Sequence, residues 1–347
     1  QVERIKKLLD PKLGDEKSEK FFSIQIEKNK PFRDSMANYP EISDAVSKMV
    51  GLNRQQGRHP CAVAITQDSL DDLLPIRWAG NKSTIEFSGD DCEGSGIIKY
   101  DVLGLITLKY FQSFFEFIST EYNDDTEKMK QKNVPTQLED IPLNDPETFK
   151  AFDKGDTESV FQFGSDVAKG ILTKVKNESL QDLSMVTAVG RPGTMENNQH
   201  HVFIKRKNGL EQPKPPHPSL KEALSDTYGI MIYQESVMMA AQILADFTLA
   251  EADDVRKAMG KKKIKVLAPY KEKFIKNCQS KHPDTQQEVR IKEGDQVVLV
   301  SKAEYLWRLM ETFSSYGFNM AHSISYALIG YYCQYLKMHY PVHWWAA

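Results

Sequence analysis

The stretch from Thr227 to Lys263 constrains the fold more than any other part of this sequence, because local signals define two consecutive helices within it. In the first helix, predicted from Tyr233 to Ala245, apolar residues recur at the three-and-four spacing of one buried stripe. These residues are Val237, Met238, Ala241, Leu244 and Ala245. The second helix is predicted to begin at a capping box of Thr248 and Glu251 and to stop at a left-handed Gly260.

A run of cations lies at the end of the second predicted helix. Its members are Arg256, Lys257, Lys261, Lys262, Lys263 and Lys265. Such a run suits the phosphates of a nucleotide or of a nucleic-acid backbone. Cations also complement the negative end of a helix dipole, and most charge runs are solvated faces. Composition alone therefore leaves anion binding and a solvated surface both open.

Composition bounds the class of protein without identifying it. With 347 residues, the chain can bury a sizeable core and is expected to form two or three domains. A net charge of -3 means that any nucleic-acid contact must come from local basic patches. The scattered cysteines favour neither a disulfide framework nor a zinc site. The sequence shows no leader and no apolar run of about eighteen residues, so we expect it in the cytoplasm. Its first residue is not Met and its last residues read as an interrupted helix, so we expect both ends to be truncated.

One apolar segment carries an acid. Residues 97–103 predict a buried strand between two glycines, and Asp101 lies within it. A buried carboxylate must be paired or must bind a cation, because burying it bare is costly. Lys99 lies two residues away and hence on the same face of the strand. A simple Lys99–Asp101 ion pair and a functional carboxylate are both open from these residues alone.

Several segments, taken in order, resemble one protein family. They are GIIKYDVLGL at residues 96–105, ESVFQFGS and VGRPG within 158–193, TYGIMIYQESVM and DDVRKAMGKKK within 227–263, and YGFNMAHSISYALIGYYCQYLKMHYP at 316–341. They resemble the alpha subunit of bacterial-type or phage-encoded DNA polymerase III, a C-family replicative polymerase. The resemblance covers most of the chain after Gly51 and is loose before it.

The resemblance implies an α+β fold: a nucleotidyltransferase-type palm, like that of polymerase beta, with a large and mostly helical fingers domain. It implies a thumb-like helical segment at 1–50, part of the palm at 51–106 and fingers at 107–347. The residues themselves predict only strands before Leu105, including one from Ala62 to Ile65, and mainly helices after it. A helix with Ile42, Val46 and Val50 on its apolar face is expected in the first segment. Residues 280–299 have no clear family counterpart.

The resemblance also implies site residues. Asp101 matches the third catalytic aspartate and metal ligand of the palm, and Lys99 matches the phosphate-facing lysine beside it. The implied nucleotide-binding residues are Arg58, His59, Arg191, Arg256, Lys257, Asn319, His322, Ser323 and Tyr326, and the implied DNA-binding residues are Lys261, Lys262, Lys263 and Lys265. The turn at Arg191-Pro192-Gly193 is expected to leave the guanidinium free. From the residues alone, rim salt bridges for Arg58 and His59 and a capping or core role for His322 stay open.

Four positions depart from the family pattern. Pro60 and Cys61 stand where the family is usually richer in Gly and Ala, which puts close approach of this backbone to a ligand in doubt. Thr194 replaces a common proline. Lys257 stands where the family usually has a second arginine, so the charge is kept but bidentate geometry is lost.

The chemistry that the resemblance implies is transfer of a deoxynucleotide to a primer 3' hydroxyl with two Mg²⁺ ions. The family carries its other two catalytic aspartates in an Asp-x-Asp pair, and this sequence contains no such pair. Asp101 would then share the metals with carboxylates elsewhere, and the chain alone is expected to be inactive. An upstream segment or a second chain would supply the pair. Alternatively, the protein is a non-catalytic DNA-binding or assembly subunit of a replisome. Expected partners are primer-template DNA, deoxynucleoside triphosphates, a sliding clamp and other replisome proteins.

Overall fold

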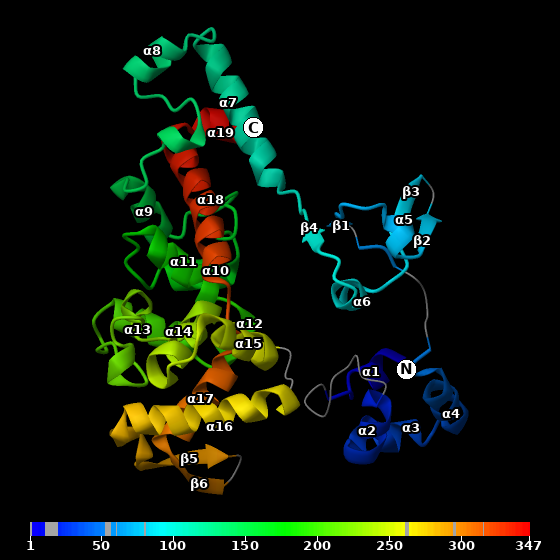
Figure 1. Ribbon diagram of the computed structural model, residues 1–347. Helices are drawn as coiled ribbons and strands as arrows, with labels where there is room; N and C mark the ends of the chain where they lie inside the picture. The colour runs from blue at the N-terminus through cyan, green and yellow to red at the C-terminus, as the bar shows by residue number, and fades with distance from the viewer. Residues whose placement is uncertain are drawn as a thin grey trace. The chain divides into compact units, whose positions relative to one another are not determined.

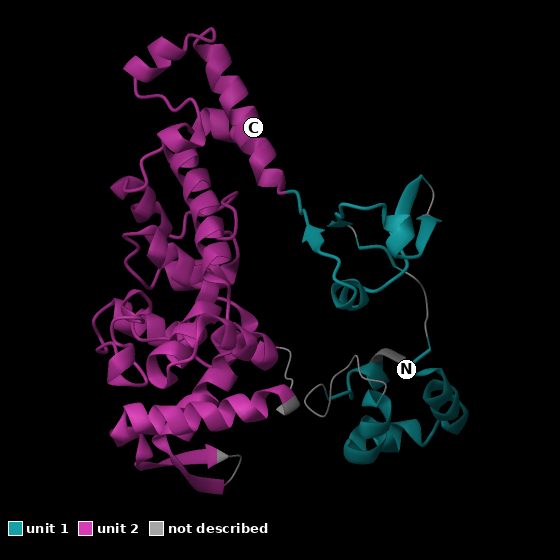
Figure 2. Cartoon of the chain, in the orientation of Figure 1, with its two compact units in different colours: residues 1–104 teal, residues 105–347 magenta. Residues whose placement is uncertain are grey.

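The chain forms two compact units, residues 1–104 and residues 105–347, in the computed structural model (Figure 2). The structure describes residues 2–10, 20–52, 57–59, 61–79, 81–260, 264–293, 296–314 and 316–347. Within these ranges, no helix combines the length and the apolar character that a bilayer crossing requires.

The described part of residues 1–50 in the first unit forms helices. They are α1 (Val2–Lys6), α2 (Phe21–Lys28), α3 (Lys30–Met36) and α4 (Pro40–Met49). Asn29 caps α3 by accepting a hydrogen bond from the Phe32 amide, and Phe32 and Met36 are buried. The predicted helix around Ile42 is confirmed, but every residue of α4 is exposed or half-buried. Its apolar stripe therefore contributes little to the core of this unit.

The rest of the first unit holds short strands and two short helices (Figure 1). They are β1 (Ala62–Ala64), α5 (Leu70–Leu73), β2 (Ile76–Ala79), β3 (Lys82–Ile85), α6 (Gly89–Gly94) and β4 (Lys99–Asp101). Strand β1 pairs antiparallel with β4, placing Ala62 opposite Asp101, and β2 pairs antiparallel with β3. A small core of Leu74, Cys92 and Ile97 lies beneath them. The strand predicted from Ala62 is confirmed.

The prediction of a buried strand over residues 97–103 is wrong in length and in burial. The strand covers three residues, Ile97 before it is buried, and the apolar residues after it are exposed, with Val102 71% exposed. Within the described residues β4 has β1 as its strand neighbour, and Tyr100 on β4 is exposed together with Val102 and Leu103 after it. Asp101 therefore lies in water, not in an apolar interior.

The second unit is mainly helical. Its elements are α7 (Ile106–Glu121), α8 (Thr126–Gln131), α9 (Pro146–Asp153), α10 (Asp166–Leu172), α11 (Leu180–Val189), α12 (Pro192–Glu196), α13 (Gln199–Lys207), α14 (Gln234–Ala245), α15 (Leu249–Gly260), α16 (Ile264–Lys281), β5 (Glu288–Glu293), β6 (Gln296–Ser301), α17 (Lys302–Ser314), α18 (Met320–His339) and α19 (Pro341–Ala346). The antiparallel β5–β6 hairpin falls largely in the segment without a clear family counterpart. Together the two units make a mixed fold of many helices and few strands, as the α+β expectation requires.

Two hydrophobic cores hold the second unit. The first packs α7, α9, α11 and α19 around the long helix α18, and the second packs α14, α15, α16 and α17 together. Helix α18 approaches its neighbours closely at Gly330, where a Cβ would overlap the buried ring of Phe163. The loop between α17 and α18 lies where elements of both cores meet, because Phe318 packs on the first core and Phe313 on the second.

The two helices predicted between Thr227 and Lys263 are confirmed. In α14, Val237, Ala241 and Leu244 are buried. The capping box is also present, because Thr248 Oγ1 accepts from the Glu251 amide at 3.2 Å and Glu251 Oε2 accepts from the Thr248 amide at 3.0 Å. The predicted stop is wrong, since α15 continues through Gly260 in helical conformation.

Candidate functional site

A cavity of about 650 Å³ in the first unit brings three of the predicted site residues together. Its lining includes Arg58 and His59, which precede β1, and Lys99 on β4. Most of the remaining wall comes from β1, β3 and the beginning of α6, with Leu70, Ile76 and Ile97. The pairing of β1 with β4 places Ala62 opposite Asp101 and Ala64 opposite Lys99, so that His59, just before β1, lies near Asp101.

The geometry around His59 decides which group pairs with Asp101. His59 Nδ1 accepts backbone hydrogen bonds from Ala62 at 2.8 Å and from Cys61 at 3.2 Å, so the ring proton lies on Nε2. The 3.8 Å separation between His59 Nδ1 and Asp101 Oδ1 is then a neighbouring contact and not an ion pair. Lys99 Nζ, at 3.1 Å from Asp101 Oδ2, is the partner of the carboxylate. The same-face pairing inferred from the strand period is confirmed.

The described residues do not by themselves make a metal site. Mg²⁺ prefers about six oxygen ligands, and Asp101 supplies a single carboxylate with an ammonium group beside it. Across the described ranges, no group of three or more His, Cys, Asp or Glu side chains is arranged to hold a metal ion. Asp91, at the start of α6, accepts from the Ser88 hydroxyl at 2.6 Å. A metal at Asp101 would need ligands from outside this set.

In the second unit, Arg191 is exposed and its guanidinium lies against the α17–α18 connection. It precedes α12 as its N-cap residue, and Pro192 occupies the first helical turn, where a missing N–H costs nothing. Its guanidinium lies 4.4 Å from the ring centroid of Phe318, and Nη1 donates to the Tyr316 carbonyl at 3.4 Å. The expectation of a free guanidinium is therefore wrong, because it lies over the Phe318 ring, with a second, long and weak bond to the Tyr316 carbonyl.

The segment Tyr316–Asn319, here called the α17–α18 loop, is itself anchored by backbone pairing. The Phe318 amide donates to the Ile232 carbonyl at 3.1 Å, and the Gln234 amide donates to the Phe318 carbonyl at 2.9 Å. Gly193 makes a close approach, since a Cβ there would lie 3.0 Å from Tyr316 Cβ. The loop is thus fixed between the start of α12 and the start of α14.

Arg256 extends from α15 to Gln234, the first residue of α14, whose backbone pairs with the same loop. Its Nε and Nη2 donate to Asp253 Oδ1 at 2.9 and 2.7 Å, and its Nη1 donates to Gln234 Oε1 at 3.1 Å. Lys257 Nζ lies 2.7 Å from the other oxygen, Asp253 Oδ2. Hydrogen bonds from Lys257 and then from Arg256 lower the pKa of Asp253. The two predicted anion-binding cations therefore share one carboxylate, which lies one turn earlier in the helix.

Internal groups already satisfy the N-terminus of α18. Asn319 Oδ1 accepts from the His322 amide at 2.8 Å, and Glu235 Oε2 accepts from the Met320 amide at 3.0 Å. A carboxylate therefore stands where the sequence suggested that a phosphate could bind. The exposed ring of His322 lies between those of Phe318 and Tyr326, with centroids at 5.2 and 3.9 Å.

Ser323 has a different environment from its neighbours in the motif. It is fully buried, and its hydroxyl bonds with Ser184 Oγ at 2.9 Å and with Thr187 Oγ1 at 2.8 Å. These bonds join α18 to α11 inside the first core. In this structure Ser323 holds the helix in place and offers no group to a ligand.

Four predicted DNA-binding lysines cannot be placed. Lys261, Lys262 and Lys263 lie outside the described residues, and so does the side chain of Lys265. Sequence reasoning, in turn, missed Gln234, Glu235 and Phe318, all of which hold the α17–α18 loop. All three residues lie within the segments that resemble the family, and this position was the available indication of their importance.

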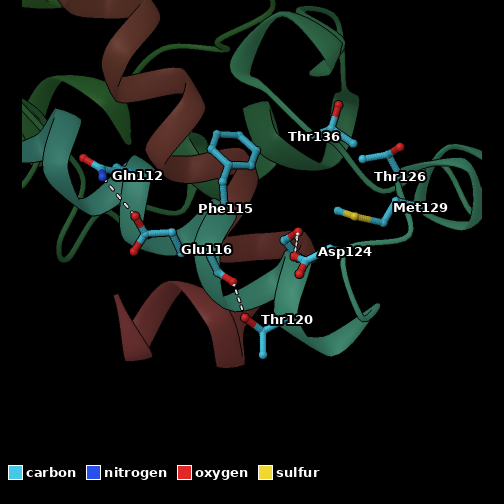
Figure 3. Close-up of a pocket in the computed structure, with 9 residues that line it drawn as sticks. Gln112, Phe115, Glu116, Thr120, Asp124, Thr126, Met129 and Thr136 are labelled. Carbon is cyan, nitrogen blue, oxygen red and sulfur yellow. Dashed lines mark hydrogen bonds between the residues drawn. The ribbon is translucent and has the colours of Figure 1, made fainter.

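A second hollow, of about 540 Å³, lies between α7 and α8 and shows no comparable chemistry (Figure 3). Its polar side chains are engaged locally, as when Gln112 donates to Glu116 at 2.9 Å and Thr120 donates to the Glu116 carbonyl at 2.8 Å. The lining residues include no Lys, Arg or His. This hollow is therefore no candidate for binding a phosphate.

Comparisons with known proteins agree with the resemblance. Residues 1–104 match the model described as the bacterial DNA polymerase III alpha NTPase domain, and residues 120–282 match the bacterial DNA polymerase III alpha subunit finger domain. Among curated relatives, the DNA polymerase III subunit alpha of Aquifex aeolicus is 35% identical over 92% of this chain and 26% of its own length. The corresponding subunit of Escherichia coli is 32% identical over 100% of this chain and 28% of its own length.

The chain spans about a quarter of the length of these relatives. The two family models match different parts of the chain and carry the name of the same subunit, as do the relatives that span most of it. The chain therefore belongs to the family of bacterial DNA polymerase III alpha subunits.

Proposed function

We propose that the chain is part of a replicative DNA polymerase that adds deoxynucleotides to a primer 3' hydroxyl under the direction of a template. The observation that carries this proposal is that Arg191 and Arg256 are both bonded to the α17–α18 loop or to a residue paired with it. Two oriented guanidinium groups suit the oxygens of a triphosphate. We assign Arg191 and Arg256 to a nucleotide site because the matching residues of the family are expected to bind the nucleotide.

In this proposal the second unit, as fingers, binds the incoming nucleotide. Arg191 and Arg256 neutralise the triphosphate, and Lys257 adds charge from a more exposed position. Asn319, His322 and Tyr326 line the same end of α18, while Ser323 positions that helix from inside. The lysines at 261–263 and 265 contact the DNA backbone.

The first unit, as palm with a thumb-like segment, binds the reacting phosphates. Lys99, Arg58 and His59 face one cavity, and Lys99 is bonded to Asp101. Asp101 contributes one carboxylate toward Mg²⁺, and the remaining ligands come from an Asp-x-Asp pair that this sequence does not contain. The protein would work in the cytoplasm with primer-template DNA, nucleotides, a sliding clamp and other replisome proteins.

Primer extension tests this function. The purified chain is assayed with Mg²⁺, primer-template and all four nucleotides, alone and together with a polypeptide that carries the Asp-x-Asp pair. We expect extension only in the second case, because one carboxylate leaves most of the metal coordination to water. Metal-dependent extension by the chain alone would mean that other acids, such as Asp90, Asp91 or Glu93, complete the site.

The lack of a complete carboxylate set in the described residues also favours a second candidate, a non-catalytic DNA-binding or assembly subunit. That candidate predicts salt-dependent binding of duplex DNA without extension in either assay. Duplex binding with no extension, even when the aspartate pair is supplied, would replace the polymerase proposal by this one.

A further inference from the structure

Gln234, the first residue of α14, joins the two parts of the arginine site. Its side-chain oxygen accepts from Arg256 Nη1 at 3.1 Å, and its side-chain nitrogen faces the Gly317 carbonyl at 3.4 Å. Its backbone amide donates to Phe318, whose ring supports Arg191. One residue thus touches both the α17–α18 loop and α15.

The orientation of the Gln234 amide follows from its partners. A guanidinium has only donors, so the atom that faces Arg256 must be the oxygen, and the nitrogen then faces the carbonyl of Gly317. The bond to Arg256 has ordinary length, whereas the bond to Gly317 is long and weak. The contact that matters for positioning is therefore the one with Arg256.

The remaining bonds of Arg256 do not fix it. Both of its other hydrogen bonds end on one atom, Asp253 Oδ1, so the guanidinium can pivot about that oxygen. Gln234 Oε1 provides the second fixed point that stops the rotation. Because a guanidinium recognises phosphate through directed N–H groups, the plane of Arg256 decides how well it meets a triphosphate.

We propose that Gln234 is a positioning residue that orients Arg256 toward the triphosphate of the incoming nucleotide. This inference rests on the proposed nucleotide-binding function of the second unit. Gln234 itself makes no contact with the nucleotide. It acts through Arg256 and keeps that arginine in register with the loop that supports Arg191.

Steady-state kinetics of the polymerase holoenzyme test the proposal with Gln234→Met, Arg256→Ala and the double variant. Methionine keeps the length of the side chain but cannot accept from Arg256. We expect Gln234→Met to raise the nucleotide KM about tenfold, the lower end for losing a hydrogen bond to a charged group, with kcat and primer-template affinity within about twofold. In the Arg256→Ala background the same change should have no further effect, because the residue acts through that arginine.

Gln242→Met is the matched control, since it makes the same replacement two turns further along α14. It should leave the KM unchanged. Two outcomes would overturn the positioning role and leave the proposed function intact. In the first, the tenfold rise in KM caused by Gln234→Met persists in the Arg256→Ala background. In the second, Gln234→Met has no effect on KM although Arg256→Ala has a large one. If Arg256→Ala and Arg191→Ala both leave the nucleotide KM unchanged, the proposed nucleotide site fails as well.

Discussion

The two candidate sites are built in opposite ways. In the first unit, Lys99 and Asp101 lie two residues apart on one short strand, and the Asp101 side chain is 52% exposed. In the second unit, Arg191 and Arg256 come from different helices and converge through the α17–α18 loop, which is anchored to α14. One site follows from local sequence spacing, and the other depends on the tertiary fold.

This difference shows where function is sensitive to change. An exposed ion pair contributes little to stability, so Lys99 and Asp101 are free to serve chemistry at small cost to folding. Arg191 contacts a ring and Arg256 bonds with an amide side chain, so their proposed role in nucleotide binding would depend on neighbours that touch no nucleotide. Substitutions should therefore act directly in the first unit and indirectly in the second.

The largest effect is expected for Asp101→Asn. The change keeps the shape of the side chain and removes its charge, so primer extension by the complete polymerase should fall by about 10² or more while folding survives. Asp72→Asn, which removes an exposed carboxylate from α5 of the same unit, is the control and should change extension little. Extension by Asp101→Asn within about tenfold of wild type would exclude a catalytic ligand role.

The next effect separates two adjacent cations of α15. The Arg256 side chain is 26% exposed and makes three hydrogen bonds, whereas that of Lys257 is 58% exposed and, among the described residues, pairs with Asp253. We expect Arg256→Ala to raise the nucleotide KM roughly ten- to a hundredfold, because an oriented charged contact is lost. Lys257→Ala should raise it only a few-fold, since a screened point charge is lost.

Duplex affinity is measured in parallel for both variants. If Arg256→Ala instead weakens primer-template binding and reduces its salt dependence, with an unchanged nucleotide KM, Arg256 belongs to the DNA-backbone contacts. An equal effect of both variants would mean that the fixed geometry of Arg256 has no role.

A smaller effect, on stability, tests the core that supports the second site. Gly330→Ala would drive a Cβ into the Phe163 ring and toward the Phe161 carbonyl, so we expect a loss of about 1–3 kcal/mol in the free energy of unfolding. Gly170→Ala, inside α10 with open space around its Cβ position, should stabilise by roughly 0.4–1 kcal/mol. Chemical denaturation measures both, and equal destabilisation by the two variants would contradict the packing argument.

Sequence patterns predicted the features that depend on near neighbours. The stripe of α14, the Thr248–Glu251 capping box and the placement of Lys99 and Asp101 on one face of a strand all involve residues within about two turns or one strand of each other. The α+β mixture followed in the same way from strands before Leu105 and helices after it. The thumb, palm and fingers boundaries remain a prediction.

The predictions that failed depended on distant partners. Burial of the strand at 97–103 would have needed a covering layer. The guanidinium of Arg191 was expected to be free, but it contacts Tyr316 and Phe318 from a distant part of the chain. The burial of Ser323 likewise follows from α11 packing on α18. Periodicity identifies the face of a helix but not the element that covers it, so no local rule could supply these contacts.

The smallest effect is a response of the second unit to acid. His217 is buried; its Nδ1 accepts from the Ser219 amide at 3.2 Å, and its Nε2 lies 3.4 Å from Asp284. Burial lowers the pKa of His217 below its ordinary value of 6.5, against the opposing hydrogen bond to Asp284. The groups around it are Asp284, the ring of His282 and Lys302.

Because the pKa of His217 is lowered in the folded state, its neutral form contributes stability above pH 6.5, and this is lost as the pH falls toward the folded-state pKa. Denaturant unfolding should thus show a smaller fall in stability between pH 7.5 and 5.5 for His217→Gln than for wild type. Glutamine can still accept from Ser219 and donate to Asp284 but cannot titrate. The difference should be smaller than the cost of Gly330→Ala, and equal pH slopes would show that proton uptake at His217 is not linked to folding. A measured difference would mean that the stability of the second unit depends on the protonation state of an interior group, His217.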